Sequence, residues 1–255
     1  MNNKFLQIVL AACFTFCAVS AVSAQAGTER TQNADSCNNA GVRELNAGNY
    51  GAAIALLNQA IRLSPQDPTI NFNLGTAYYR NGQYEQAVAK LQRVLELYPQ
   101  YTSAYNQIGV VYADSQQYDK ALAAFKEAIR QRPDNALALF NLGCIYIRMN
   151  DFKAAVGPLV QSLTIEPNNA EALNSLSWAY TLLKRYREAI VTARRAVTLK
   201  PEFAEAHVLL GILFLLTKDR TSAIEEYQIV KSLDQNSAQV LYSQLSRGRV
   251  VNAYK

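Results

Sequence analysis

The chain has 255 residues, of which 50% are hydrophobic and 18% are charged, and its formal net charge at pH 7 is +5. This composition is typical of a folded chain and argues against a long disordered segment. The excess of 25 basic over 20 acidic side chains is mild and spread along the chain, so the composition disfavours nucleic-acid binding.

The first 24 residues have the pattern of an export signal. Lys4 gives a short basic start, an apolar stretch follows, and small residues precede a cleavage point after Ala24. We therefore predict a signal peptide over 1–24 and a short linker over 25–33. The protein is expected to be exported to the periplasm or secreted, from a bacterium.

Two alternatives to cleavage stay open. The sequence from Leu10 to Cys13 resembles a bacterial lipobox, which would leave Cys13 lipidated, although the residues after it are apolar where a lipoprotein tether is usually polar. The apolar stretch of about 18 residues is also marginally long enough to stay as an uncleaved anchor. Contact with a membrane is expected only in these two cases.

A proline recurs every 34 residues through the rest of the chain, at Pro65, Pro99, Pro133, Pro167 and Pro201. A fixed period of this size is typical of stacked repeats. When each proline is the thirty-second residue of its unit, six units follow over 34–67, 68–101, 102–135, 136–169, 170–203 and 204–237. A stack of repeats presents surface to partners, so the period favours binding over catalysis.

Small and large residues recur at fixed positions in these units. The eighth position is glycine in five units, the seventeenth is aromatic in five, and the twentieth is alanine in all six. Within 68–101, two apolar stretches with helical spacing flank a break at Asn81-Gly82, so each unit is expected to be a helical pair. The small residues let the two helices approach closely.

These columns resemble the tetratricopeptide repeat over residues 34–237. The resemblance implies an all-α fold, a right-handed α-solenoid of six helical hairpins. We expect residues 238–255 to add a capping helix and a basic tail. Val240, Leu241 and Leu245 are expected on the apolar face of that helix.

No pattern that carries catalysis or holds a cofactor or metal occurs in the sequence. The single histidine, His207, has no second His or Cys at ligand spacing, so a packing role is the better interpretation. Glu225 and Glu226 are expected to be solvated. Cys37 and Cys144 lie three units apart, too far for a disulfide. We therefore expect that the protein is not an enzyme.

The resemblance also implies a binding surface, because in this family the first helix of each unit lines a concave groove. Carboxamides recur at its sixth position, and an amide can pair with a peptide backbone whatever the peptide's side chains are. The alternative is that these amides bond between adjacent helices. The expected groove residues are Asn39, Asn73, Arg80, Gln107, Phe140, Asn141, Arg148 and Trp178.

The C-terminal half of this groove is expected to be apolar around Trp178. An aromatic anchor in an apolar patch commonly carries binding energy, but the capping helix is also expected to cover the apolar run Val208–Leu216. Arg80 and Arg148 suit a carboxylate of a partner, or a neighbouring acid such as Asp114.

We therefore expect a non-enzymatic scaffold of the cell envelope that binds a peptide segment of a protein partner, and no nucleic acid. Two alternatives stay open. One is a lipoprotein assembly factor of an outer-membrane machine, similar to the pilotins of type IV pili. The other is a regulatory subunit of an envelope enzyme.

Overall fold

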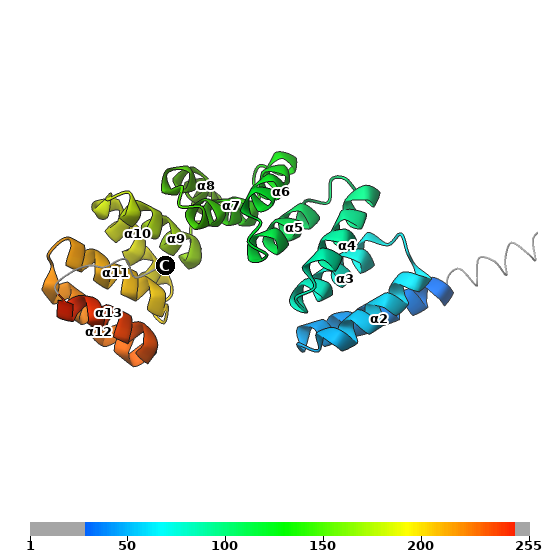
Figure 1. Ribbon diagram of the computed structural model, residues 1–255, viewed down its shortest axis with the longest axis horizontal. Helices are drawn as coiled ribbons and strands as arrows, with labels where there is room; N and C mark the ends of the chain where they lie inside the picture. The colour runs from blue at the N-terminus through cyan, green and yellow to red at the C-terminus, as the bar shows by residue number, and fades with distance from the viewer. Residues whose placement is uncertain (1–28, 248–255) are drawn as a thin grey trace, which may run out of the picture. The chain divides into compact units, whose positions relative to one another are not determined.

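The computed structural model describes residues 29–247, which are helical apart from short connections and contain no strand (Figure 1). The chain divides into unit 1, which ends at Val111, and unit 2, which begins at Tyr112. The predicted signal peptide, Cys13 and the basic tail beyond residue 247 lie outside the described residues. Residues 29–33, which were expected in a linker, are part of a helix over 29–46.

Unit 1 is a row of helices joined by short turns, in which α3 packs on both α2 and α4. The division between the units falls within α5. After the helix over 29–46, the helices are α2 (Tyr50–Leu63), α3 (Pro68–Arg80), α4 (Tyr84–Leu97) and α5 (Thr102–Asp114).

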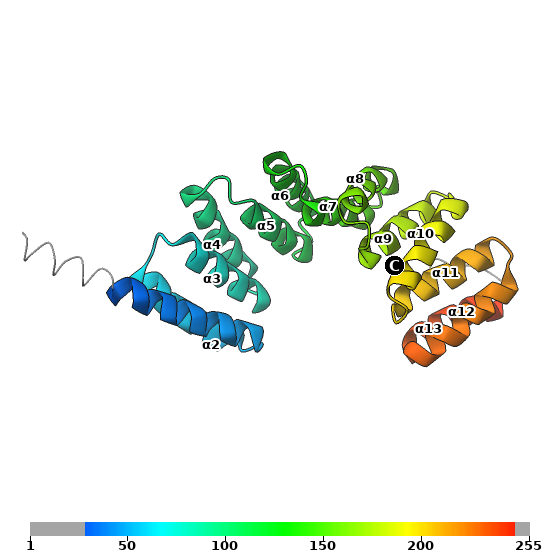
Figure 2. The same cartoon turned by 180° about the vertical axis from the view of Figure 1, so that it is seen from behind.

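In unit 2 each helix packs on the next one along the chain, from α6 to α13, and α9 also contacts α7 and α11 (Figure 2). The prediction of an all-α stack of helical hairpins with a final helix is confirmed. The helices are α6 (Tyr118–Gln131), α7 (Ala136–Arg148), α8 (Phe152–Ile165), α9 (Ala170–Leu182), α10 (Tyr186–Leu199), α11 (Ala204–Leu216), α12 (Arg220–Leu233) and α13 (Gln235–Arg247).

Each hairpin has a first and a second helix, and polar side chains cap the start of several first helices. Asp67 accepts from the backbone N–H of Thr69 at 2.8 Å, before α3. Asn169 does the same for Ala172 at 2.8 Å, before α9. Each cap satisfies an N–H that the first turn of a helix leaves without a partner.

The turn inside each hairpin contains one residue with a positive φ. In unit 1 this residue is glycine, which adopts the left-handed region without a steric penalty. In unit 2 it carries a side chain, which costs about 1–2 kcal/mol for each such residue. The residues are Gly48 and Gly82 in unit 1, and Gln116, Asn150, Lys184 and Lys218 in unit 2, with φ between 58° and 81°.

The final helix begins at Gln235, earlier than the expected residue 238. The carboxylate of Asp234 accepts from the backbone N–H of Ser237 at 2.7 Å and so caps the helix at this point. Leu241 is fully buried, while Val240 is 38% exposed. The expectation that both lie on one apolar face was wrong, because neighbouring residues on a helix point about 100° apart.

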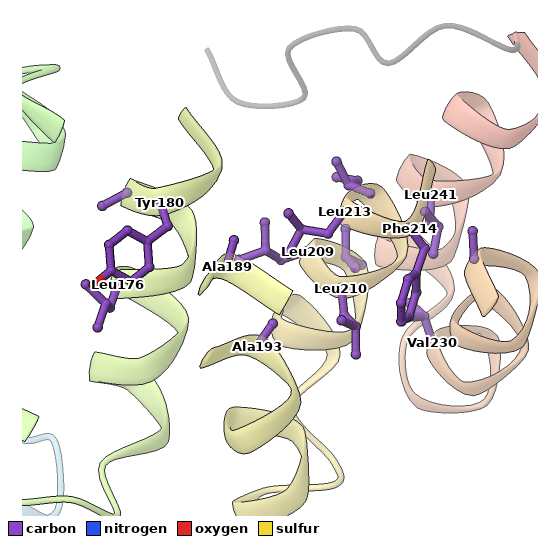
Figure 3. Close-up of a cluster of buried hydrophobic side chains, with 14 of the residues drawn as sticks. Leu176, Tyr180, Ala189, Ala193, Leu209, Leu210, Leu213, Phe214, Val230 and Leu241 are labelled. Carbon is purple, nitrogen blue, oxygen red and sulfur yellow. The ribbon is translucent and has the colours of Figure 1, made fainter. Parts of the chain in front are cut away.

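The core of the C-terminal part of unit 2 is built around α11 (Figure 3). Nearly every residue of α11 is buried, as its all-round hydrophobic sequence requires. Neighbouring helices on every side supply the remaining side chains. The cluster drawn in Figure 3 includes Leu176, Tyr180, Ala189, Ala193, Leu209, Leu210, Leu213, Phe214, Val230 and Leu241.

Two glycines allow a matched test of the close helix crossing. A Cβ added at Gly143 would lie 2.5 Å from Cγ of Leu159, which is fully buried, whereas one added at Gly157 would meet nothing within 4 Å. We expect Gly143→Ala to lower the free energy of unfolding by about 1–3 kcal/mol through overpacking. Gly157→Ala should change it by no more than about 0.5 kcal/mol, because helix propensity favours alanine while Pro158 disfavours a helical residue with a Cβ before it. Urea unfolding followed by circular dichroism measures both, and equal effects would contradict this account of the crossing.

Candidate functional site

The first helices of unit 2 form the more closely packed layer of their stack. α9 contacts both α7 and α11, whereas α8, α10 and α12 make no comparable contacts with one another in the described part of unit 2. A stack whose helices are closer together on one side is concave on that side. We call the side of α7, α9 and α11 that carries Phe140, Ile147, Trp178, Leu215 and Leu216 the inner face.

The inner face is apolar. Its five named side chains are partly buried and pack against the buried cluster around α11. Val208, Leu209 and Ile212 of the same apolar run are at most 4% exposed. The expectation of self-burial therefore holds for these three residues of α11. The five residues of the inner face, however, keep part of their apolar surface accessible.

The polar groups of α7 are already engaged with other residues. Cys144 Sγ lies 3.8 Å from Ser175 Oγ, and burial raises the pKa of this thiol, which keeps it neutral. Arg148 Nη1 lies 3.7 Å from Asp114 Oδ1, so the expected pairing with this acid occurs. Because the Arg148 side chain is half exposed, the pair contributes little.

In unit 1 one of the carboxamides that were predicted to line the groove bonds to an adjacent helix. The Nδ2 group of Asn73 donates to Oδ1 of Asn38 at 2.9 Å, and Asn38 is buried. This contact is the structural alternative to peptide binding. Asn39 and Arg80 are exposed, and the Arg80 guanidinium lies 5.8 Å from the centre of the Tyr79 ring.

The predicted site residues fall into both units. Asn39, Asn73, Arg80 and Gln107 belong to unit 1, and Gln107 is partly buried in α5. The others belong to unit 2, where Phe140, Asn141 and Arg148 lie on α7 and Trp178 lies on α9. Asn141 and Trp178 are partly buried.

One residue that the prediction of the site omitted is Asn174 on α9. Its Oδ1 is buried and has no hydrogen-bond partner among the described residues. Asn174 stands at the fifth position of its 34-residue repeat, as Asn38 does. Asn38 is bonded to Asn73 of the next repeat, and the residue at the position of Asn73 in the repeat after Asn174 is Leu209. Leucine cannot donate a hydrogen bond, so the Asn174 acceptor is left unpaired. A comparison of the two positions in the sequence could have found this residue.

The histidine lies in the interior, between α11 and α12. Its Nδ1 donates to Glu226 Oε2 at 2.6 Å, and its Nε2 donates to the carbonyl oxygen of Pro201 at 3.0 Å. Glu226 is only 13% exposed, so the expectation that it is solvated was wrong. The hydrogen bond to Glu226 raises the pKa of His207. Asn71 uses the carbonyl of Pro65 in the same way, at 3.1 Å.

The described part of the chain offers neither a metal site nor a helix that could span a membrane. Residues 29–247 contain no group of three or more His, Cys, Asp or Glu side chains that could hold a metal ion. No helix in this range is both long enough and apolar enough to cross a bilayer.

Tetratricopeptide repeat profiles match the chain over residues 38–102, 111–150, 136–169 and 170–203. No curated protein sequence matches it. PilF of Pseudomonas aeruginosa is 18% identical, with a TM-score of 0.75 over 87% of this chain and 100% of PilF. MamA of Desulfovibrio magneticus RS-1 is 23% identical, with a TM-score of 0.62 over 66% of this chain and 96% of that structure. YrrB, described as a TPR protein with an unusual peptide-binding site, is 21% identical, with a TM-score of 0.61 over 73% of this chain and 97% of YrrB. The chain belongs to the tetratricopeptide repeat family.

Proposed function

We propose that the protein is an exported, non-enzymatic scaffold that binds an apolar peptide segment of another envelope protein on the inner face of unit 2. The observation that carries this proposal is the half-buried Trp178, which lies among the apolar side chains of α7 and α11. Surfaces of this kind, with an aromatic side chain at their centre, commonly supply most of the energy of a protein interface.

Asn174 supports the same location. Burying an acceptor without a partner costs about 1–3 kcal/mol, so the fold retains this amide at the expense of stability. The amide as a whole is only partly buried, so we propose that its side chain rotates when the segment binds and brings the oxygen to the inner face. There it accepts from a backbone N–H of the bound segment, which recovers the lost hydrogen bond. We expect Asn141 on α7 to bring a second amide to the peptide backbone, in place of the contact that it makes in the free chain.

Affinity capture from an envelope extract, followed by titration with the captured segment, tests this function. Trp178 is the only tryptophan in the chain, so its fluorescence reports on the inner face directly. Binding should shift its emission. The Trp178→Ala, Asn141→Ala variant should bind at least tenfold more weakly, since truncating a central aromatic residue typically costs about 2 kcal/mol or more.

Val160→Ala is the matched control, because Val160 lies on a second helix, α8, and is 41% exposed. It should bind as the wild type does. The Trp178 variant could also remain folded and bind the partner as tightly as the wild type does. That result would place binding away from the inner face and disprove the proposal.

A second candidate function is that of a lipoprotein assembly factor of an outer-membrane machine, and the lipobox-like sequence before Cys13 favours it. Incorporation of radiolabelled palmitate that is lost in Cys13→Ser would support this role. A mature N-terminus at Gln25 would exclude it. The regulatory subunit of an envelope enzyme is tested by whether an activity co-purifies with the chain.

A further inference from the structure

Basic side chains of unit 2 are concentrated on α10 and at its two ends. Six of them lie between Lys184 and Lys200, against the single acid Glu188, so this short stretch carries a net charge equal to that of the whole chain. The basic excess is therefore concentrated in this stretch, whereas we expected it to be spread along the chain. All except Lys200 are exposed.

Internal contacts occupy only some of these groups. Arg185 pairs with Glu188 at 2.8 Å and Lys200 pairs with Glu171 at 3.0 Å. Arg195 donates to the carbonyl of Pro167 at 3.0 Å.

The remaining cations are Lys184, which lies just before α10, and Arg187 and Arg194 within it. Among the described residues, Lys184 and Arg187 have no acidic oxygen within ion-pair distance. The Arg194 guanidinium lies 5.5 Å from the centre of the Phe214 ring, a contact that leaves its outer edge to solvent. Arg187 lies near Glu188 and Arg194 near Asp219, but neither forms an ion pair with that acid, so three cationic groups are still available to an anionic partner.

An exposed apolar residue lies between these cations. Arg187, Val191 and Arg194 are separated by four and three residues, so they share one face of α10. Val191 is 61% exposed, more than any other large hydrophobic residue of the described chain. We call Lys184, Arg187, Val191 and Arg194 the α10 stripe.

The preceding second helix does not neutralise this charge. α8 contains no acidic residue, and its one charged side chain is Lys153. Val160 of α8 is also exposed. Within the described residues, α8 and α10 therefore offer cations and isolated apolar side chains, and the acids nearest to them are Glu188, which is already paired, and Asp219 before α12, which lies near Arg194.

We propose that the α10 stripe binds an acidic amphipathic helix of a partner protein. Charge complementarity indicates the carboxylates, because the cations recur at the spacing with which one face of a helix presents its side chains. Val191 indicates a helix with an apolar residue between its acids. A free phosphate would satisfy the cations but would gain nothing from this valine, and a single exposed valine gives a lipid surface little apolar area to bury. The stripe lies on a second helix, so this interaction is independent of the proposed inner-face site.

Binding of a synthetic peptide to the full chain tests the proposal. The probe is an acetylated helical peptide with glutamates along one face and a leucine between them, and a peptide with glutamines in place of the glutamates is its control. We expect saturable binding that weakens as salt is added. Arg187→Glu, Arg194→Glu should weaken it at least tenfold, because reversing two cations turns attraction into repulsion.

The matched control variant is Lys120→Glu, Lys231→Glu, which makes the same change in net charge on α6 and α12. It should bind nearly as wild type does. Val191→Ser keeps the charge and should weaken binding several-fold. Equal losses in the two double variants, no effect of Val191→Ser, or tighter binding to phosphatidylglycerol vesicles than to the peptide would each overturn the proposal. Unchanged thermal unfolding of the variants excludes misfolding as the cause.

Discussion

Replacing Leu213 with alanine is expected to lower the free energy of unfolding by about 3–5 kcal/mol. Leu213 is fully buried in the cluster around α11, which also takes in side chains of α9, α10, α12 and α13 (Figure 3). Truncation removes apolar contacts and leaves a cavity that close-packed helices fill only in part. Denaturant unfolding followed by circular dichroism measures the loss.

The control for this truncation is Leu137→Ala. Leu137 also lies on a first helix, α7, but it is 56% exposed. The same chemical change should therefore alter stability by no more than about 0.5 kcal/mol. If the two variants unfolded at the same denaturant concentration, burial around α11 would not be what stabilises this end of the chain.

Unit 2 is expected to lose stability as the pH rises through the pKa of His207. Both ring nitrogens contact oxygen acceptors, so the folded state favours the doubly protonated ring. The pKa in the folded protein is raised above the ordinary value, mainly by the hydrogen bond to Glu226. The stabilisation is therefore complete below the ordinary pKa and is lost as the pH rises through the raised one.

His207 is the only histidine in the chain, so a single NMR signal reports its titration. His207→Leu should cost about 1.5–3 kcal/mol at slightly acidic pH, because the carboxylate of Glu226 then loses its charged partner. His207→Asn copies Asn71, which bonds to the equivalent proline carbonyl. It should fold and lose the pH dependence. A histidine signal that titrates at or below its ordinary pKa would refute this account.

The repeat columns were sufficient to predict the architecture. The proline period and the glycine and alanine columns depend only on local rules, since each marks a helix end or a close crossing. The start of α13 was missed because its signal is the capping carboxylate of Asp234, and the period does not reveal a cap. The role of Glu226 could not be predicted from its neighbour Glu225, because only the packing of α12 on α11 brings it to His207.

The candidate site was less predictable for a similar reason. A position map indicates which side chains face a groove, but it does not reveal which of them already bond to one another. Asn73 was expected to hold a peptide, and its amide is bonded to Asn38. Asn174 was not among the predicted site residues, yet its oxygen is the unpaired one. The difference depends on the residue at the sixth position of the following repeat, which is Asn73 next to Asn38 and Leu209 next to Asn174.

The turn residues with positive φ add more backbone strain to unit 2 than to unit 1. Four turns of unit 2 hold a residue with a side chain where unit 1 has glycine, and the strain at the three that are not asparagine amounts to roughly 3 kcal/mol or more in total. That is comparable to a large part of the net stability of an ordinary domain, about 5–15 kcal/mol. The lysines at two of these turns are therefore costly to keep. Glycine at these two turns would adopt the same backbone conformation without that strain.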